Sequence, residues 1–481
     1  MATIIKRGTL VTAAETFEAD ILIDGEKISL IGKDFRHPEA DVVDARGKLV
    51  MPGGIDPHTH FDLPMFGTVS SDDHYTGHKA AAFGGTTTVM DFVPLESRAE
   101  WSASGDEAGI FKHSVDLWLE KSAKAAIDYS FHMNLTQFDE KIAREIPSLR
   151  EMGITTLKVF TAYNGRLRID DGGIFKALQI ARDNGMLVMA HCENGDVIDT
   201  LIADALNTGR WQPEWHALTR PGWGGVESTL RVAGMAAAAE ASVYIVHMNV
   251  GGEVDMLKYA RERGVKAMGE TCPQYLFFTI EDLRRPDGAK WICSPPMRAA
   301  QDNVRLWDGL SEGTLQTIGT DHCPFFYDGT RPIVYEGREI AIPGKELGKD
   351  DFTKIPNGLP GVEDRLPVMW TCGVRAGKIT ANQFVAYNST NPARIFGLYP
   401  RKGALLPGSD ADIVIWNPDK KVRYGVAHAH QRTDYNLYEG WELTGMPEKV
   451  FLRGRLIVDG EQWLGKAGMG TFLKREEGLF I

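Results

Sequence analysis

Thr155-Thr156-Leu157-Lys158-Val159-Phe160 and Leu187-Val188-Met189-Ala190-His191 are two short apolar runs of the kind that form buried β-strands. Between them, residues 175–182 (Phe175 to Arg182) form a helical interval. A strand, a helix and a second strand in this order predict a parallel βαβ unit, because parallel strands need a crossover of about a dozen or more residues.

The same alternation of strand-like and helical stretches extends from about Gly54 to Leu398. Eight βα units predict a closed (β/α)8 TIM barrel of the α/β class, whose chemistry lies at the carboxyl ends of the strands. Further predicted helices cover Ser228 to Glu240 and Glu253 to Arg263, the second ending at Gly264. The eight candidate strands are Gly54 to His60, Thr86 to Val93, Ile127 to Leu135, Thr155 to Phe160, Leu187 to His191, Val243 to His247, Val265 to Glu270 and Leu315 to Asp321.

Both ends of the chain have a different pattern of short strands and turns. Residues 21–28 contain an apolar run, Asp24-Gly25 and a second apolar segment, which predicts a hairpin, and similar short strands are predicted within 411–416 and 449–458. Because two marginal strand sets each lack a core of their own, we expect them to pair. The predicted organisation is a β-sandwich domain with a C-terminal tail, residues 1–53 plus 399–481, around a catalytic barrel of residues 54–398.

The composition excludes several classes of function. The 481 residues carry 53 basic and 65 acidic side chains, a formal net charge of −12, so nucleic acid is not an expected partner. The N-terminus lacks a signal peptide and no run of about 18 apolar residues occurs, so we expect a soluble, cytoplasmic protein without a membrane partner. Five cysteines without a CxxC pair argue against disulfides and a cysteine-based zinc site.

His58-Thr59-His60 closes the first candidate strand. Because side chains alternate along a strand, both imidazoles project to the same side, about 6 to 7 Å apart, and can converge on one cation. An isolated pair of this kind is a weak signal, since solvated or hydrogen-bonded histidines are common.

The other strand ends strengthen this signal. Lys158 lies within an apolar strand, where an unpaired ammonium is costly to bury, and His191, His247 and Asp321 each follow an apolar run. Taken singly, each histidine has an alternative as a core residue bonded to a backbone carbonyl, and Asp321 has one as a helix cap. Taken together, they describe the mouth of a single barrel and predict a metal site.

The chain resembles the dihydropyrimidinase and D-hydantoinase family of the amidohydrolase superfamily, closest to the bacterial dihydropyrimidinases. The resemblance covers nearly the whole chain, and its motifs occur in the family's order. They are Gly53-Gly54-Ile55-Asp56-Pro57-His58-Thr59-His60-Phe61-Asp62, Phe66-Gly67-Thr68-Val69-Ser70-Ser71-Asp72-Asp73, Gly84-Gly85-Thr86-Thr87-Thr88, Leu157-Lys158-Val159-Phe160, Ala190-His191-Cys192-Glu193-Asn194, Cys293-Ser294-Pro295-Pro296, Gly319-Thr320-Asp321-His322-Cys323 and Pro356-Asn357-Gly358.

The resemblance implies a centre of two Zn²⁺ ions per subunit. His58, His60 and Asp321 would bind one ion and His191 and His247 the other, with Lys158, as N6-carboxylysine, and a hydroxide bridging them. The chemistry is consistent, because a lysine kept neutral by burial is nucleophilic toward carbon dioxide and the resulting carboxylate offers two oxygens to two cations. Asp321 would move the hydroxide's proton to the departing nitrogen.

The resemblance also implies the substrate contacts. Tyr163 would donate to the oxyanion, and the backbone groups of Ser294 and Asn357 would hold the ring amides. From the residues alone, Tyr163 has an alternative as a loop tyrosine, and Asn357-Gly358 has one as a turn. Apolar walls for an exocyclic group are expected from Met65, Phe66 and Phe160, although core packing explains these three nearly as well.

The implied function is a zinc-dependent cyclic amidase that opens dihydrouracil and dihydrothymine to N-carbamoyl-β-amino acids. A D-hydantoinase or allantoinase is the alternative, and a non-catalytic scaffold like the collapsin response mediator proteins is disfavoured because all six metal-ligand positions are filled.

Related dihydroorotases carry an arginine two residues after the HxH, where this chain has Asp62, so a substrate carboxylate is disfavoured. Residues 327–343 look like an insertion that could cover the site. Relatives imply a homotetramer whose partner is a small cyclic ureide.

Overall fold

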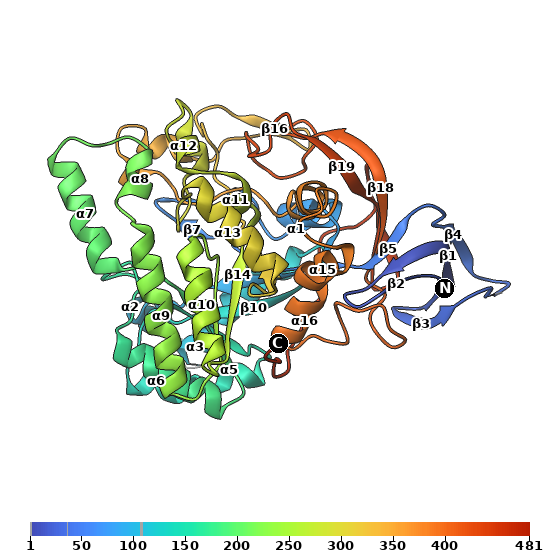
Figure 1. The fold of residues 1–481 in the computed structure, drawn as a ribbon, viewed down its shortest axis with the longest axis horizontal. Coiled ribbons are helices and arrows are strands. Elements are labelled where there is room, and N and C mark those ends of the chain that lie inside the picture. Colours follow the sequence, from blue (N-terminus) through green and yellow to red (C-terminus); the bar gives the residue numbers. More distant parts are fainter. Residues whose placement is uncertain (1, 36, 106–108) are drawn as a thin grey trace.

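The computed structural model describes residues 2–35, 37–105 and 109–481, and its centre is an eight-stranded sheet (Figure 1). The strand order is β15-β14-β13-β12-β11-β10-β9-β6, and every neighbouring pair is parallel. The predicted barrel class is therefore confirmed. The strands are β6 (Gly54–Thr59), β9 (Thr86–Val93), β10 (Asp128–Asn134), β11 (Thr156–Phe160), β12 (Leu187–His191), β13 (Val243–Ile245), β14 (Ala267–Thr271) and β15 (Thr317–Ile318).

Two of these strands end two or three residues earlier than the sequence predicts. The prediction extends strand β13 to His247 and strand β15 to Asp321, but β13 ends at Ile245 and β15 at Ile318. The reason is local: His247 has φ +38° and Asp321 has φ +54°, and a positive φ is incompatible with an extended strand.

Backbone and side-chain hydrogen bonds close the barrel between its first and last strands, β6 and β15. One isolated bridge joins Thr59 to His322 at this seam. Below it, the Asp56 carboxylate accepts hydrogen bonds from the Thr320 backbone N–H at 3.1 Å and from the Thr320 hydroxyl at 2.7 Å. The buried Arg365 guanidinium donates to the carbonyls of Ile55 and Ile318, both at 2.8 Å. The seam that carries His58, His60 and Asp321 is thus held by an aspartate and an arginine.

Helices form the outer layer, and α6, α9 and α10 lie side by side on the left in Figure 1. Helix α6 (Asp171–Asp183) begins before the predicted Phe175 because the Asp170 side chain caps it, accepting from the Gly173 N–H at 2.7 Å. None of the helices in the described ranges is long and apolar enough to cross a membrane. The others are α1 (Thr76–Phe83), α2 (Arg98–Ser104), α3 (Ile110–Lys121), α4 (Glu140–Glu145), α5 (Ser148–Glu151), α7 (Gly195–Asn207), α8 (Glu214–Leu218), α9 (Gly222–Ala238), α10 (Gly251–Glu262), α11 (Pro273–Phe277), α12 (Ile280–Leu283), α13 (Ala300–Ser311), α14 (Arg365–Met369), α15 (Ala381–Val385) and α16 (Asn391–Ile395).

A second, mixed sheet is built from both ends of the chain, as predicted, and lies to the right of the barrel in Figure 1. Its order is β21-β20-β19-β18-β5-β1-β2-β3, with β4 beside β1, and the antiparallel β5–β18 pair joins the two chain ends. Ile21, Ile413 and Phe451 share one apolar cluster, so strands from both ends bury a common core. The strands are β1 (Ala2–Val11), β2 (Thr16–Asp24), β3 (Lys27–Gly32), β4 (Asp41–Asp44), β5 (Leu49–Pro52), β18 (Ile413–Arg423), β19 (Glu442–Leu452), β20 (Arg455–Asp459) and β21 (Gln462–Trp463).

Three further segments complete the fold. The hairpin of β7 (Pro64–Met65) and β8 (Thr68–Val69) follows the first barrel strand, and the segment predicted as an insertion contains the hairpin of β16 (Ile333–Tyr335) and β17 (Arg338–Ile340). The C-terminal tail packs against the barrel, where the Leu473 N–H donates to the Tyr129 carbonyl at 2.7 Å. The exact domain limits, residues 53 and 399, stay a prediction.

Candidate active site

A cavity of about 1180 Å³ lies at the carboxyl ends of the barrel strands. All residues that the sequence analysis assigned to metal, catalysis or substrate line it, although they come from distant parts of the chain. They are His58, His60, Lys158, Tyr163, His191, His247, Ser294, Asp321 and Asn357, together with the apolar candidates Met65, Phe66 and Phe160.

Two groups of potential ligands face each other in this cavity. In the first, Asp321 Oδ1 lies 3.2 Å from His58 Nε2 and 3.1 Å from His60 Nε2. In the second, His191 Nδ1 lies 3.0 Å from His247 Nε2. The groups are adjacent, because ligand atoms of His58, His247 and Asp321 all lie within 4.8 Å of one another.

Two buried glutamates determine which ring nitrogen of His58 and of His191 faces the other potential metal ligands. Glu270 Oε1 lies 2.7 Å from His58 Nδ1 and also accepts the His247 backbone N–H at 3.1 Å. Glu193 Oε2 lies 2.8 Å from His191 Nε2. Each glutamate therefore holds the proton of its histidine on the far nitrogen, as carboxylates behind metal-ligating histidines do.

The orientation of the His58 and His191 rings favours a bound cation. Burial lowers the pKa of both His58 and His191, so each ring is neutral with one proton. His58 Nε2 then turns a lone pair toward the Asp321 carboxylate, and His191 Nδ1 turns one toward His247. The lone pair of His58 and the Asp321 carboxylate repel each other, whereas a divalent cation between them would be bound by both, since imidazole and carboxylate are ordinary zinc ligands. The donor set therefore fits the metal centre that the sequence implies.

Lys158 lies among these ligands in an apolar environment. Its side chain is buried, and Nζ lies 4.8 Å from the ring centre of Phe92 and 5.4 Å from that of Phe160. Burial lowers the pKa of Lys158 to about 8, with partial compensation from Asp321 and Glu270. A lowered pKa increases the fraction of neutral amine near neutral pH, and the neutral amine is the state that carboxylation by carbon dioxide requires.

The predicted substrate contacts form one wall of the cavity. The Asn357 amide donates to the Ser294 hydroxyl at 3.0 Å, so the two side chains satisfy each other. Among the described residues, the backbone N–H and C=O groups of Ser294 and Asn357 have no protein partner. The Tyr163 ring lies 5.1 Å from that of His191, and burial raises the pKa of its phenol, which stays a neutral donor.

Three of the proposed catalytic and metal-binding residues have strained backbones. Tyr163, His247 and Asp321 have φ of +69°, +38° and +54°, in the left-handed region that non-glycine residues rarely adopt. Such strain is kept where the surrounding structure fixes it, and it occurs preferentially at functional sites. Here the three residues lie two or three positions after the end of a strand, and their side chains line the cavity.

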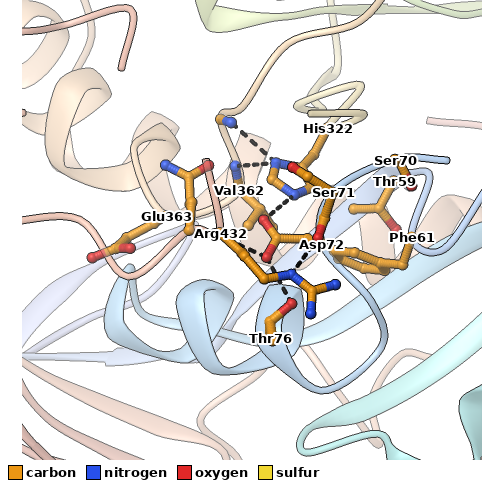
Figure 2. A network of polar contacts seen from close by, with 12 residues as sticks. Thr59, Phe61, Ser70, Ser71, Asp72, Thr76, His322, Val362, Glu363 and Arg432 are labelled. Carbon is orange, nitrogen blue, oxygen red and sulfur yellow. Dashed lines mark hydrogen bonds and ion pairs between the residues drawn. The ribbon is translucent and has the colours of Figure 1, made fainter. Parts of the chain in front are cut away.

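A polar network behind the cavity fixes the loop that follows Asp321 (Figure 2). His322 Nδ1 accepts the backbone N–H groups of Gly361 and Val362 at 3.1 and 3.2 Å, so its proton is on Nε2, which donates to Asp72 at 3.2 Å. Asp72 also accepts from the Thr76 hydroxyl at 2.7 Å and from the Arg432 backbone N–H at 3.0 Å. This network gives the motif around Asp72 a structural role.

The sequence analysis did not identify Glu270, Glu193 or Arg220 as site residues. Arg220 lines the cavity, and its guanidinium lies 3.3 Å from Glu193. Glu270 could have been found from the sequence, because it is an acidic residue near the end of a buried strand. Conversely, within the described ranges no residue of 327–343 lines the cavity; this segment instead contacts helix α1, where Lys79 pairs with Glu336 at 2.7 Å.

Comparison with known proteins places this arrangement in a family. The model of the amidohydrolase family matches residues 49–457. The chain belongs to the amidohydrolase family. It is 42% identical to the D-hydantoinase of Geobacillus stearothermophilus, with 99% of this chain and 97% of that protein covered.

Solved structures show the same likeness. The crystal structure of dihydropyrimidinase from Brevibacillus agri NCHU1002 matches with a TM-score of 0.93 and 43% identity, covering 100% of both chains. The L-hydantoinase (dihydropyrimidinase) from Arthrobacter aurescens matches with a TM-score of 0.85 and 26% identity, over 98% of this chain and 99% of the other. The predicted resemblance to dihydropyrimidinases and D-hydantoinases is thus confirmed, and so is the prediction of an enzyme.

Proposed function

We propose that this amidohydrolase is a zinc-dependent cyclic amidase that opens 5,6-dihydropyrimidines such as dihydrouracil to N-carbamoyl-β-amino acids. The observation that carries the proposal is the pair of facing ligand groups beside buried Lys158, in a cavity that also exposes the backbone of Ser294 and Asn357. The names of the similar proteins support the same class of substrate.

Six side chains would hold the metal. His58, His60 and Asp321 would bind one zinc ion, and His191 and His247 the other. Carboxylated Lys158 would bridge them, because its neutral amine can add to carbon dioxide, forming an N–C bond and releasing a proton. When bound, two zinc ions supply an activated water at neutral pH and polarise the amide carbonyl.

The protein's own groups bind and orient the ring. The open N–H and C=O groups of Ser294 and Asn357 pair with the ring's amide C=O and N–H, which positions the reacting carbonyl. Tyr163 donates its phenolic hydrogen to the oxyanion that forms on attack. Asp321 takes the proton of the attacking water and delivers it to the ring nitrogen as the C–N bond breaks.

Among the described residues outside the proposed metal centre, the cavity offers no buried, unpaired cation to a substrate carboxylate. Of its basic side chains, Lys121 donates to the Asp62 carbonyl at 2.7 Å, Arg220 is paired with Glu193, and Arg166 is exposed to solvent. Burying an unpaired carboxylate costs several kcal/mol, or several powers of ten in rate. Dihydroorotate should therefore be a poor substrate.

The test is a comparison of kcat/KM for dihydrouracil, dihydrothymine, hydantoin, allantoin and dihydroorotate with zinc-loaded enzyme. We expect the two dihydropyrimidines and hydantoin to be opened and dihydroorotate to be at least about a hundredfold slower. A preference for hydantoins over dihydrouracil would favour the second candidate, a D-hydantoinase, which is the name of several similar proteins. Dihydroorotate hydrolysis within tenfold of dihydrouracil would overturn the substrate assignment.

The homotetramer that the family resemblance implies and the cytoplasmic location that the sequence analysis expects are part of this proposal. Sedimentation velocity of the purified protein tests the first, where a species of four chains is the expected result and a monomer contradicts it.

A further inference from the structure

Lys345 is a buried lysine outside the proposed metal centre. It begins the short 3₁₀ turn Lys345–Gly348 and is 1% exposed, yet it does not line the cavity. Within the described ranges, its amine forms no ion pair, and the carboxylate that acts on it from farther away is Asp434. Because a buried ammonium without a counter-charge is costly, its presence here requires a specific reason.

The amine bonds to two backbone carbonyls from different loops. Nζ donates to the Ile292 carbonyl at 3.0 Å and to the Pro356 carbonyl at 2.9 Å. Pro356 directly precedes Asn357, and Ile292 lies two residues before Ser294. Lys345 thus joins the backbones of the two loops that provide the proposed ring contacts.

Other contacts connect the same two loops. The Gly358 N–H donates to the Ile292 carbonyl at 3.1 Å, and the Asn357 amide donates to the Ser294 hydroxyl. The lysine therefore completes a set of bonds on the side away from the cavity.

We propose that Lys345 is a positioning residue that holds the Ser294 and Asn357 loops at the spacing needed to bind the substrate ring. The inference rests on the proposed function only in treating Ser294 and Asn357 as ring contacts. Lys345 touches neither substrate nor metal, so it acts through these loops.

The segment that carries Lys345 is closely packed, as a positioning role requires. The Lys345 N–H donates to the Phe326 carbonyl at 2.7 Å. A Cβ added at Gly344 would lie 2.0 Å from the Phe326 carbonyl oxygen, and one at Gly348 would lie 2.2 Å from the Ile355 nitrogen. Only glycine fits at these two positions, so the backbone on either side of the lysine is packed against Phe326 and against Ile355, which directly precedes Pro356.

The link that the Lys345 amine forms between the Ile292 and Pro356 carbonyls, here called the clamp, does not depend on the charge of the amine. Burial lowers the pKa of Lys345 to about 7, so both protonation states occur near neutral pH. An ammonium has three N–H donors and a neutral amine has two, and either number is enough for two carbonyl acceptors.

The kinetic test compares Lys345→Met with the control Lys354→Met, which removes an exposed lysine of the same segment. Ring contacts made in both ground and transition states affect KM more than kcat. We therefore expect Lys345→Met to raise KM about tenfold or more with kcat within about threefold, and the control to change neither. An unchanged KM, or a fall in kcat alone, contradicts the proposal.

A second readout does not depend on any substrate. Hydrogen exchange of peptides covering 291–298 and 355–360 should be faster in Lys345→Met than in the wild type and in Lys354→Met, with equal zinc content. Unchanged hydrogen exchange in both peptides contradicts the positioning role of Lys345. This result can be read even if the wild type opens none of the rings tested. If Lys345→Met does not fold, Lys345→Gln, whose shorter side chain cannot reach both carbonyls, is measured in the same way and must show the same exchange.

Discussion

Glu270 and Glu193 control the chemistry of the candidate metal centre without contributing ligands to it. Each holds a histidine proton on the far nitrogen, which leaves the near nitrogen free to bind metal. Glu193 is itself held by Arg220, and Glu270 by the Tyr244 hydroxyl at 2.9 Å. Ligand orientation therefore depends on a shell of buried polar residues outside the ligands themselves.

Replacing Glu270 tests this dependence. In Glu270→Gln a neutral amide replaces the carboxylate behind His58, so the ring is a poorer ligand. We expect zinc affinity to fall about 10- to 100-fold, measured by competition with a chelator. Glu262→Gln, on the exposed side of α10, is the control. Equal zinc affinity in all three proteins would show that Glu270 has no such role.

Tyr163 is expected to act in the transition state. Removing one oxyanion donor typically costs about 10²- to 10³-fold in kcat, so Tyr163→Phe should lower kcat and kcat/KM by similar factors. The matched control is Tyr259→Phe, because Tyr259 is 43% exposed on helix α10. A change confined to KM would show that Tyr163 only helps binding.

At the scale of elements, strands β9 and β12 have the bounds that the sequence predicts. Strands buried on both faces are rich in apolar and β-branched residues, as Thr86-Thr87-Thr88-Val89-Met90 of β9 shows, which makes them recognisable without structural data. The early ends of β13 and β15 were not predictable, because no local signal indicates a positive φ at a histidine or an aspartate. The hydrogen bonds of Glu270, Arg220 and Lys345 were not predictable either, since their partners lie on other elements.

The seam between β6 and β15 provides a test at this scale. Arg365→Met removes the donor that bridges Ile55 and Ile318 and leaves Asp56, 3.9 Å away, without a buried cation. We expect a loss of about 3–5 kcal/mol in the free energy of unfolding, measured with a chemical denaturant. Arg375→Met, on a side chain that is 45% exposed, should cost little. Equal stability of the two variants would contradict the closing role of Arg365.

At the scale of the whole molecule, a buried charge cluster joins the barrel to the terminal sheet. Lys402 is 1% exposed, and its amine lies 2.6 Å from Asp128 of β10 and 2.7 and 3.1 Å from Asp412 and Asp410, which precede β18. Arg453 also pairs with Asp128. The sequence predicts the two units from their strand patterns, but charges more than 270 residues apart give no local sign that they meet.

Removing the central cation should weaken this junction. Lys402→Met leaves the buried Asp412 carboxylate without a cation, whereas Asp128 keeps Arg453 and Asp410 keeps Lys27 and Arg401. We therefore expect a loss of about 3–5 kcal/mol in the free energy of unfolding at pH 8. The loss should shrink toward pH 5, because unpaired buried carboxylates have raised pKa values and become neutral as the pH falls. Denaturant unfolding at both pH values measures this, with Lys421→Met on the exposed part of β18 as the control. A loss independent of pH would argue against an unpaired buried carboxylate as its cause.

The central claim is that the facing ligand groups form a metal centre that opens cyclic ureides. The most direct test is the rate of dihydrouracil hydrolysis by purified enzyme, after removal of metal with a chelator and again after stepwise addition of zinc. We predict that hydrolysis is lost in the metal-free protein and returns fully at about two zinc ions per chain, because two groups of ligands are present. Full hydrolysis by metal-free protein, or none with zinc restored, would contradict the account.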